Sequence, residues 1–240
     1  MMLTRLTRCS LIGMLSSVML FASGCASVKQ DEYQNERDPW ETFNRKVFKF
    51  NDVSDRYVLK PLTKGYKYIT PDPIETGVSN AFSNLGEPVS LLNSLLQGKV
   101  KQSGLTLSRF VVNSTLGIAG LFDVATKMGI DAGDGEDFGQ TLAVWGVPSG
   151  PYIVVPFLGP STLRDGSGMA VDSQLGLLEQ IDHVPTRNQV YGLRLLDIRS
   201  SLLEAEKLMS GDRYSFMRDA YLDRREFLVN DGEIEDDFGF

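Results

Sequence analysis

The chain has 240 residues, and its 31 Asp and Glu residues outnumber its 24 Lys and Arg residues, for a formal net charge of −7. This acidic balance argues against a nucleic-acid-binding protein and against electrostatic capture by anionic lipid head groups. The length suffices for one sizeable domain. Both cysteines, Cys9 and Cys25, lie close to the N-terminus. The remainder therefore offers no disulfide, thiolate metal site or cysteine nucleophile.

The N-terminus has the pattern of a secretory signal. Arg5 and Arg8 precede an apolar run over residues 11–22, which is too short for a permanent membrane span. The run ends in small residues before Cys25, a pattern that resembles a bacterial lipobox. An ordinary signal peptide is the alternative. We predict a signal peptide over residues 1–24.

The lipobox resemblance has consequences for the mature protein. It implies acylation of Cys25, palmitate included, and several acyl chains make a stable membrane anchor. Ala26 stands where an inner-membrane retention signal would place Asp, which favours the outer membrane. Residues 25–37 are mostly polar and aperiodic, and we interpret them as a lipidated tether.

The domain opens with two similar helix-start signals. Asp38 is expected to cap a helix, with Pro39 at the first helical position and Glu41 completing a capping box. The same pattern returns at residues 72–75, where Asp72 is the expected cap. Pro61 and the Pro71/Pro73 pair are expected to break the chain between these helices.

The next region is strongly apolar. Pro88 is expected to open a third helix that stops at Gly98, and a fourth is expected from about residue 103. Residues 105–125 approach transmembrane length, but they contain Arg109 and Asp123, and a charge at the centre of a span costs about 2.5–3.5 kcal/mol. We expect two shorter helices, broken near residues 117–120, that are buried or lie partly in one leaflet.

A glycine-rich acidic loop follows over residues 127–137. Its carboxylates resemble a calcium loop, but their alternation does not fit the EF-hand pattern. We interpret it as a solvated turn and predict no metal site and no cofactor.

Residues 138–165 combine four prolines with glycines and large apolar side chains. The prolines exclude a long helix, and Pro156 argues against an interior strand. The segment is nevertheless too apolar for an ordinary solvated loop. It is either a buried loop or a stiff apolar flap over a lipid path.

The C-terminal part predicts three further helices. Ser161 or Thr162 is expected to cap the first, Thr186 the second, as part of a capping box, and Asp212 the third. An acidic tail occupies residues 233–240. The predicted fold is all-α, with little or no β structure, in a single domain over residues 38–232.

The sequence gives little support to an enzyme. His183 is the only histidine, and no G-x-S-x-G motif is present; Ser167 is the nearest imitation of a nucleophile. Arg164 and Asp165 are more consistent with an ion pair that fixes the end of the flap than with acid–base chemistry. We predict that the protein is not an enzyme.

Five segments together resemble the VacJ/MlaA family of outer-membrane lipoproteins, and they extend over nearly the whole expected mature chain. They are DPWETFNR at 38–45, NLGEPVSLLNSLLQG at 84–98, SRFVVNSTLGIAGLFDVA at 108–125, FGQTLAVWGVPSGPYIVVPFLGPSTLRDG at 138–166 and REFLVNDG at 225–232.

The resemblance implies a ring of amphipathic helices around a central channel, in the inner leaflet of the outer membrane of a Gram-negative bacterium. Such proteins lie beside a trimeric porin on the periplasmic face. They remove phospholipid mislocalised in the outer leaflet and pass it to a soluble periplasmic lipid-binding protein of the Mla pathway, which maintains lipid asymmetry. The alternatives left open are a structural envelope lipoprotein and a membrane-associated lipid hydrolase.

The resemblance also supplies candidate residues. The proline- and glycine-rich hairpin that shapes the channel corresponds to Trp145, Gly146, Pro148, Gly150, Pro151, Tyr152, Pro156, Phe157 and Gly159. The matching first helix contributes Phe43, Asn44, Phe50 and Asn51 to the ring.

Overall fold

The computed structural model describes residues 36–233. The predicted signal peptide, Cys25, most of the tether and the acidic tail lie outside this range. The helices in chain order are α2 (Glu41–Ser54), the π-helical turn η1 (Asp55–Leu59), α3 (Lys60–Ile69), α4 (Asp72–Leu96), α5 (Val100–Thr115), α6 (Val124–Lys127), α7 (Phe138–Val144), α8 (Leu163–Leu175), η2 (Leu177–Gln180), α9 (Val184–Ala205), η3 (Glu206–Leu208) and α10 (Arg213–Val229).

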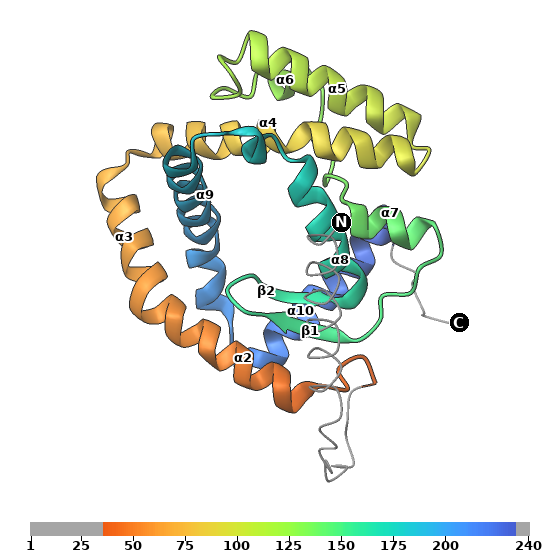
Figure 1. The fold of residues 1–240 in the computed structure, drawn as a ribbon. Helices are drawn as coiled ribbons and strands as arrows, with labels where there is room; N and C mark the ends of the chain where they lie inside the picture. Colours follow the sequence, from red (N-terminus) through yellow and green to blue (C-terminus); the bar gives the residue numbers. More distant parts are fainter. Residues whose placement is uncertain (1–35, 234–240) are drawn as a thin grey trace, which may run out of the picture. The chain divides into compact units, whose positions relative to one another are not determined.

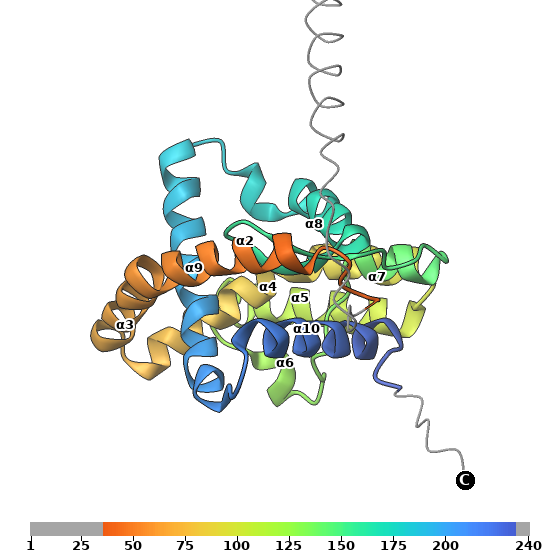
Figure 2. The same cartoon turned by 90° about the horizontal axis from the view of Figure 1, so that it is seen from below.

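The helices of residues 36–233 form a ring. In Figure 1, α2, α3, α4 and α8 follow one another around it, α5 and α6 lie against the outer side of α4, and α9 stands inside it. In the edge-on view of Figure 2, α2, α3 and α4 share one layer, α10 lies on one face of that layer, and α8 and the start of α9 lie towards the other. The predicted all-α ring is confirmed.

The only strands in the described range form a two-stranded antiparallel hairpin, β1 (Tyr152–Val155) and β2 (Gly159–Thr162). Tyr152 pairs with Thr162, and Val155 pairs with Gly159. Pro156 falls in the turn, just beyond β1, where it costs no ladder hydrogen bond. The hairpin projects into the ring in Figure 1.

Several predicted helix starts are wrong. Helix α2 begins at Glu41, and its first turn has no side-chain cap, because the carboxylate of Asp38 is buried elsewhere in the fold. Asp72 is the first residue of α4 and caps nothing. Helix α9 begins at Val184, and its cap is the ring nitrogen of His183, which accepts from the Thr186 amide.

The predicted break at the Pro71/Pro73 pair is confirmed, since α3 ends at Ile69 and Pro71 precedes α4. Two other predicted proline breaks are wrong. Helix α4 runs through Pro88 without interruption, so the second and third expected helices are one. Pro61 lies in the first turn of α3, where its missing N–H costs least. The π-helical turn η1 joins α2 to α3 without a gap.

The break predicted within residues 105–125 is confirmed. Helix α5 ends at Thr115, and a run of turns follows in which Ile118, Ala119 and Gly120 have positive φ angles. A Cβ atom on Gly120 would lie 2.5 Å from Cβ of Asn84, so only glycine fits this close approach to α4. The ion pair between Arg109 and Asp123, at 3.1 Å, joins α5 to the residue that precedes α6.

The caps of the other two C-terminal helices match the prediction. The Thr162 side chain accepts from the Asp165 amide at the start of α8. The Asp212 carboxylate accepts from the Tyr214 amide at the start of α10.

The distribution of polarity is inverted relative to an ordinary soluble domain. Within residues 36–233, six apolar side chains are buried against twenty polar or charged ones. Many large apolar side chains are exposed, among them Tyr68 on α3, which is 92% exposed. Exposed apolar area of this extent marks contact with a partner or a membrane. No helix among the described residues has the length and hydropathy to cross a bilayer.

Candidate functional site

The root of the hairpin is part of the small apolar core. Tyr152 is completely buried, and with Val154 it packs against Tyr214 and Leu222 of α10. The candidate residue Tyr152 therefore fixes the hairpin in the fold and does not face open space. Burial raises the pKa of its hydroxyl above the ordinary tyrosine value, because the charged form is poorly solvated there.

Two asparagine side chains of α2 hold the outer edge of β1. Asn44 Nδ2 donates to the Tyr152 carbonyl at 3.0 Å, and Asn44 Oδ1 accepts from the Val154 amide at 2.9 Å. Asn51 repeats the arrangement nearer the tip: it donates to the Val155 carbonyl at 3.0 Å and accepts from the Phe157 amide at 2.8 Å. The two carboxamides thus take the place of a third strand.

The spacing of this pair follows from the geometry of the two elements. Seven residues separate Asn44 from Asn51, which corresponds to two helical turns and a rise of about 10.5 Å. The bonded carbonyls belong to Tyr152 and Val155 of β1, and the bonded amides belong to Val154 and to Phe157 in the turn. The two asparagines therefore hold the hairpin at two points along α2, one within β1 and one where β1 enters its turn.

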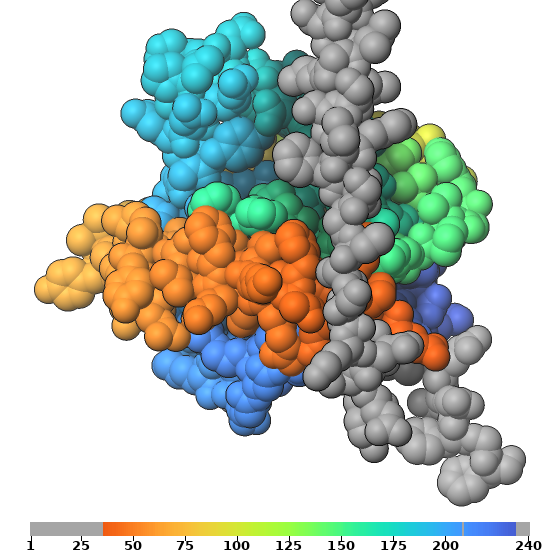
Figure 3. Space-filling model, turned by 60° about the horizontal axis from the view of Figure 1, so that its bottom comes forward, coloured from red at the N-terminus to blue at the C-terminus, as the bar shows by residue number. Residues whose placement is uncertain are grey.

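The tip of the hairpin is apolar and exposed. Phe157 is 73% exposed and Leu158 is 65% exposed. Phe157 has a positive φ of 63°, and its ring contacts Phe50 of α2 edge to face, with the ring centres 5.1 Å apart. Figure 3 shows the green hairpin directly beside the orange α2. Four candidate residues, Phe50, Asn51, Pro156 and Phe157, therefore meet at one place.

The other candidates lie apart from this tip. Trp145 follows α7, where its indole N–H donates to the Leu96 carbonyl at 3.2 Å and its ring contacts Phe138. Gly146 and Pro148 are exposed, and Gly150 and Pro151 lead into β1. Gly159 begins β2 with a φ of 89°. Phe43 is exposed on α2.

A buried acidic group at the foot of α2 was not identified as a site by sequence. Asp38 accepts from Asn44 Nδ2 at 2.8 Å and from the Tyr214 hydroxyl at 2.5 Å, and it lies 3.3 Å from Arg218. Burial and the Asp38 charge raise the pKa of the Tyr214 hydroxyl, which keeps it protonated as a donor. Asp38 thus joins the hairpin clamp to α10. The sequence pattern predicted that Asp38 caps α2, because its true partners, Tyr214 and Arg218, lie far along the chain and are not visible in local sequence.

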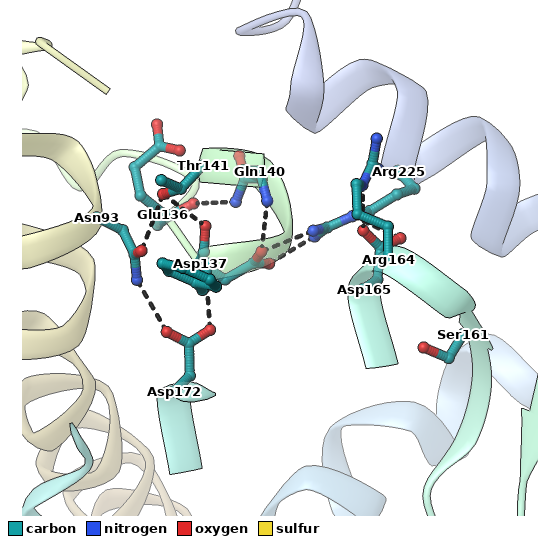
Figure 4. A network of polar contacts seen from close by, with 12 residues as sticks. Asn93, Glu136, Asp137, Gln140, Thr141, Ser161, Arg164, Asp165, Asp172 and Arg225 are labelled. Carbon is teal, nitrogen blue, oxygen red and sulfur yellow. Dashed lines mark hydrogen bonds and ion pairs between the residues drawn. The ribbon is translucent and has the colours of Figure 1, made fainter. Parts of the chain in front are cut away.

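A second polar network fixes the other end of the hairpin (Figure 4). Both guanidinium NH groups of Arg225 bind Asp137, and its Nε lies 3.0 Å from Asp165 Oδ2. The predicted ion pair between Arg164 and Asp165 is present at 2.9 Å and is buried. Burial opposes ionisation of Asp165, but Arg225 and Arg164 together hold its pKa below the ordinary value. The residues directly after β2 are therefore tied to α10.

Asp172 extends this network to α4. Its two oxygens accept from Asn93 Nδ2 at 2.9 Å and from the Phe138 amide at 2.8 Å, and Asn93 Oδ1 accepts from the Thr141 hydroxyl. Burial raises the pKa of Asp172. The network joins α4, α7, α8 and α10, so it holds the ring closed on the side opposite α3.

Ser167 and His183, the residues that a lipid hydrolase would have to use, both make local structural contacts. The Ser167 hydroxyl donates to the Arg164 carbonyl at 2.6 Å. His183 Nδ1 lies 2.8 Å from the Thr186 hydroxyl and caps α9. Within residues 36–233, the two side chains form no hydrogen bond with each other, and no cluster of potential metal ligands occurs.

Comparison with known proteins shows which family has this architecture. The family model described as MlaA lipoprotein matches residues 36–228. The intermembrane phospholipid transport system lipoprotein MlaA of Escherichia coli is 36% identical over 217 residues, with 88% of this chain and 86% of that protein covered. The protein of the same name from Haemophilus influenzae is 36% identical over 236 residues, covering 95% and 93%.

A solved structure also matches this chain in fold and sequence. It is described as the structural basis for maintenance of bacterial outer membrane lipid asymmetry, and it aligns with a TM-score of 0.72 and 34% identity over 80% of this chain and 99% of that one. Fold and matches together define a lipoprotein built as a helical ring. The chain belongs to the MlaA lipoprotein family.

Proposed function

We propose that this protein transports phospholipid between the membranes of a Gram-negative envelope and so maintains the lipid asymmetry of the outer membrane. The observation that supports this most is the inverted polarity of the ring, with polar side chains between its helices and apolar ones exposed. Helices with an exposed apolar face and no capacity to span a bilayer are suited to lie within one leaflet.

In this proposal the ring interior is the lipid path. A phospholipid that moved through hydrocarbon unaided would carry its polar head group across at a cost of several kcal/mol. A ring that lies in the inner leaflet can give the head group a polar route, while the exposed Phe157 and Leu158 at the hairpin tip contact acyl chains. No covalent step is needed, so the proposed activity is transport without catalysis.

The finer assignments complete the proposal. Cys25 carries the lipid anchor, and the protein lies on the periplasmic face of the outer membrane beside a trimeric porin. It removes phospholipid mislocalised in the outer leaflet and passes it to a soluble periplasmic lipid-binding protein. These assignments are supported by the relatives whose names refer to an intermembrane phospholipid transport system.

Mass spectrometry of the detergent-extracted protein tests the proposal. We expect phospholipid to co-purify with it in a defined molar ratio, and we expect deletion of the protein to raise the phospholipid content of the outer leaflet. A structural envelope lipoprotein would purify without bound phospholipid, and its loss would leave the outer-leaflet content unchanged.

A further inference from the structure

A charged cavity of about 530 Å³ lies apart from the hairpin, where α2, η1 and α3 meet η3 and the start of α10. It is lined by Asp52, Asp55, Arg56, Lys60, Pro61, Lys64, Glu206 and Arg213. The helices that form it belong to segments about 150 residues apart in the chain.

Four of the lining residues form one row. Asp52, Arg56, Lys60 and Lys64 are spaced by four residues each, and all of them line the same cavity. On an ideal α-helix, a row with this spacing drifts by about 40° at each step, so its ends would face different directions. The π-helical turn over Asp55–Leu59 accommodates an extra residue and counters this drift. Such turns occur frequently at functional sites.

Two of the three carboxylates are already fully engaged. Both oxygens of Asp55 bind Arg199, at 2.7 and 2.8 Å. Asp52 pairs with Arg213 at 2.8 Å and with Arg56 at 3.1 Å. Each oxygen of these two carboxylates thus contacts a cation of the cluster.

The third carboxylate is shared by three cations. Glu206 pairs with Arg199 at 2.6 Å, with Lys60 at 2.8 Å and with Arg213 at 3.2 Å. Burial opposes its ionisation, but Arg199 and Lys60 lower its pKa to about 2, so it remains charged at neutral pH.

The balance of the cluster is therefore positive. Among the residues that line the cavity, Arg56, Lys60, Lys64 and Arg213 supply four positive charges against three carboxylates, in a chain whose net charge is −7. Lys64 is exposed at the cavity and forms no ion pair with any described residue. An excess of guanidinium and ammonium groups around an open cavity is suited to bind a phosphate.

We propose that this cavity binds the phosphate of a phospholipid head group. The proposal rests on the lipid-transport function inferred above and assigns the head group a place. Figure 2 shows the C-terminal end of α9 and α10 on the same face of the ring, away from α8. A phosphate held there would retain a lipid at this face while its acyl chains contact exposed apolar side chains of the ring.

The test is a 31P NMR titration of the detergent-solubilised full protein with dihexanoylphosphatidylglycerol below its micelle concentration. We expect saturable binding that weakens about three- to tenfold in Lys64→Gln and again in Arg213→Gln, because each change removes a charge near the phosphate. Lys64 makes no ion pair within residues 36–233, so its variant should fold normally. Lys46→Gln, at an exposed site on α2 outside the cavity, is the matched control and should bind as the wild type does.

Each other outcome overturns the proposal in a distinguishable way. Equal affinity in the wild type and Lys64→Gln would remove the site, while co-purified phospholipid would still support transport. Inorganic phosphate that binds in a Lys64-dependent manner, without competition from phosphatidylglycerol, would make this a site for free phosphate. A wild-type protein that purifies without phospholipid would contradict the transport function itself.

Discussion

At the residue scale, the decisive contacts are those of Asn44 and Asn51. Each carboxamide both donates to and accepts from the hairpin backbone, as a neighbouring strand would. The resemblance placed both residues in the ring, but their role depends on partners more than one hundred residues away. Sequence periodicity carries no information about such long-range contacts, so this part of the site could not be predicted.

Asn51 should control the tip of the hairpin. Asn51→Ala removes both hydrogen bonds, each worth about 1 kcal/mol. Asn51→Asp retains the acceptor for the Phe157 amide but places a carboxylate against the Val155 carbonyl. We expect faster hydrogen exchange at the Phe157 amide in both variants, with unchanged protection in β1 near Tyr152, and more phospholipid in the outer leaflet.

Asn188→Ala is the matched control for this prediction, because Asn188 is exposed on α9 away from the hairpin. Unchanged exchange at Phe157 in Asn51→Ala would show that the Asn51 clamp does not position the tip.

Acid should weaken the fold at identifiable residues. Burial by itself would raise the carboxyl pKa of both Asp123 and Glu206. Hydrogen bonds and nearby cations outweigh it and lower each pKa to about 2. Such carboxyls bind protons more tightly in the unfolded chain, so their stabilisation is complete above about pH 4.5 and is lost as the pH falls towards 2. We expect the melting temperature to fall steadily over this range.

Arg199→Gln should flatten that pH dependence, because it removes a cation that holds the Glu206 pKa low. The exposed Arg194→Gln on the same helix should leave it unchanged. Identical pH profiles for Arg199→Gln and the wild type would contradict the assignment of Glu206.

At the element scale, the sequence correctly predicted the helix boundaries that depend on contacts between residues close together in the chain. The caps at Thr162 and Asp212 and the break after α5 match the sequence because their partners are within a few residues. The expected cap at Asp38 failed because tertiary partners bind its carboxylate. The expected break at Pro88 failed because packing against α5 keeps α4 continuous despite the lost hydrogen bond.

His183 gives a direct test of the capping role against a hydrolase. His183→Ala should lower the unfolding free energy by about 0.5–2 kcal/mol, the usual cost of a lost cap. His183→Asp restores a capping acceptor and should recover most of that loss. Both variants should transport lipid normally. Loss of lipid turnover in both variants, independent of stability, would instead indicate catalysis.

Variants of two glycines in the segment before β1 can distinguish the effect of backbone strain from the effect of steric crowding. Gly146 and Gly150 have φ angles of 86° and 69°. A Cβ at Gly146 meets open space, whereas one at Gly150 lies 3.3 Å from Leu163 Cβ. Both alanine variants pay about 1–2 kcal/mol for the left-handed backbone, but only Gly150→Ala should also displace the hairpin.

We therefore expect Gly150→Ala to raise outer-leaflet phospholipid and detergent sensitivity more than Gly146→Ala does. Pro151→Gly, which loosens the same approach to β1, should act in the same direction as Gly150→Ala. Wild-type lipid content and detergent resistance in Gly150→Ala and Pro151→Gly would show that the stiffness of this segment has no part in transport.

At the scale of the whole described unit, the sequence patterns predicted helical content, and the resemblance implied the ring. The closure of the ring depends on contacts between distant segments: α2 with β1, α3 with α9, and the Arg225 network with α7 and α8. The inverted burial follows from that closure, because the polar faces of amphipathic helices turn towards one another. Helical periodicity alone could not decide which face would be buried.

Transport through the ring requires lipid inside it, and site-specific photo-crosslinking measures this directly. A benzophenone amino acid at Phe157 is expected to form a phospholipid adduct in intact cells, detected by the mass of the purified protein. The same probe at Tyr68, exposed on α3, should also capture lipid, because a ring that lies in the leaflet turns this position towards the surrounding membrane. Adducts at Tyr68 with none at Phe157 would show a ring embedded in the membrane but empty of lipid, and would contradict transport through it.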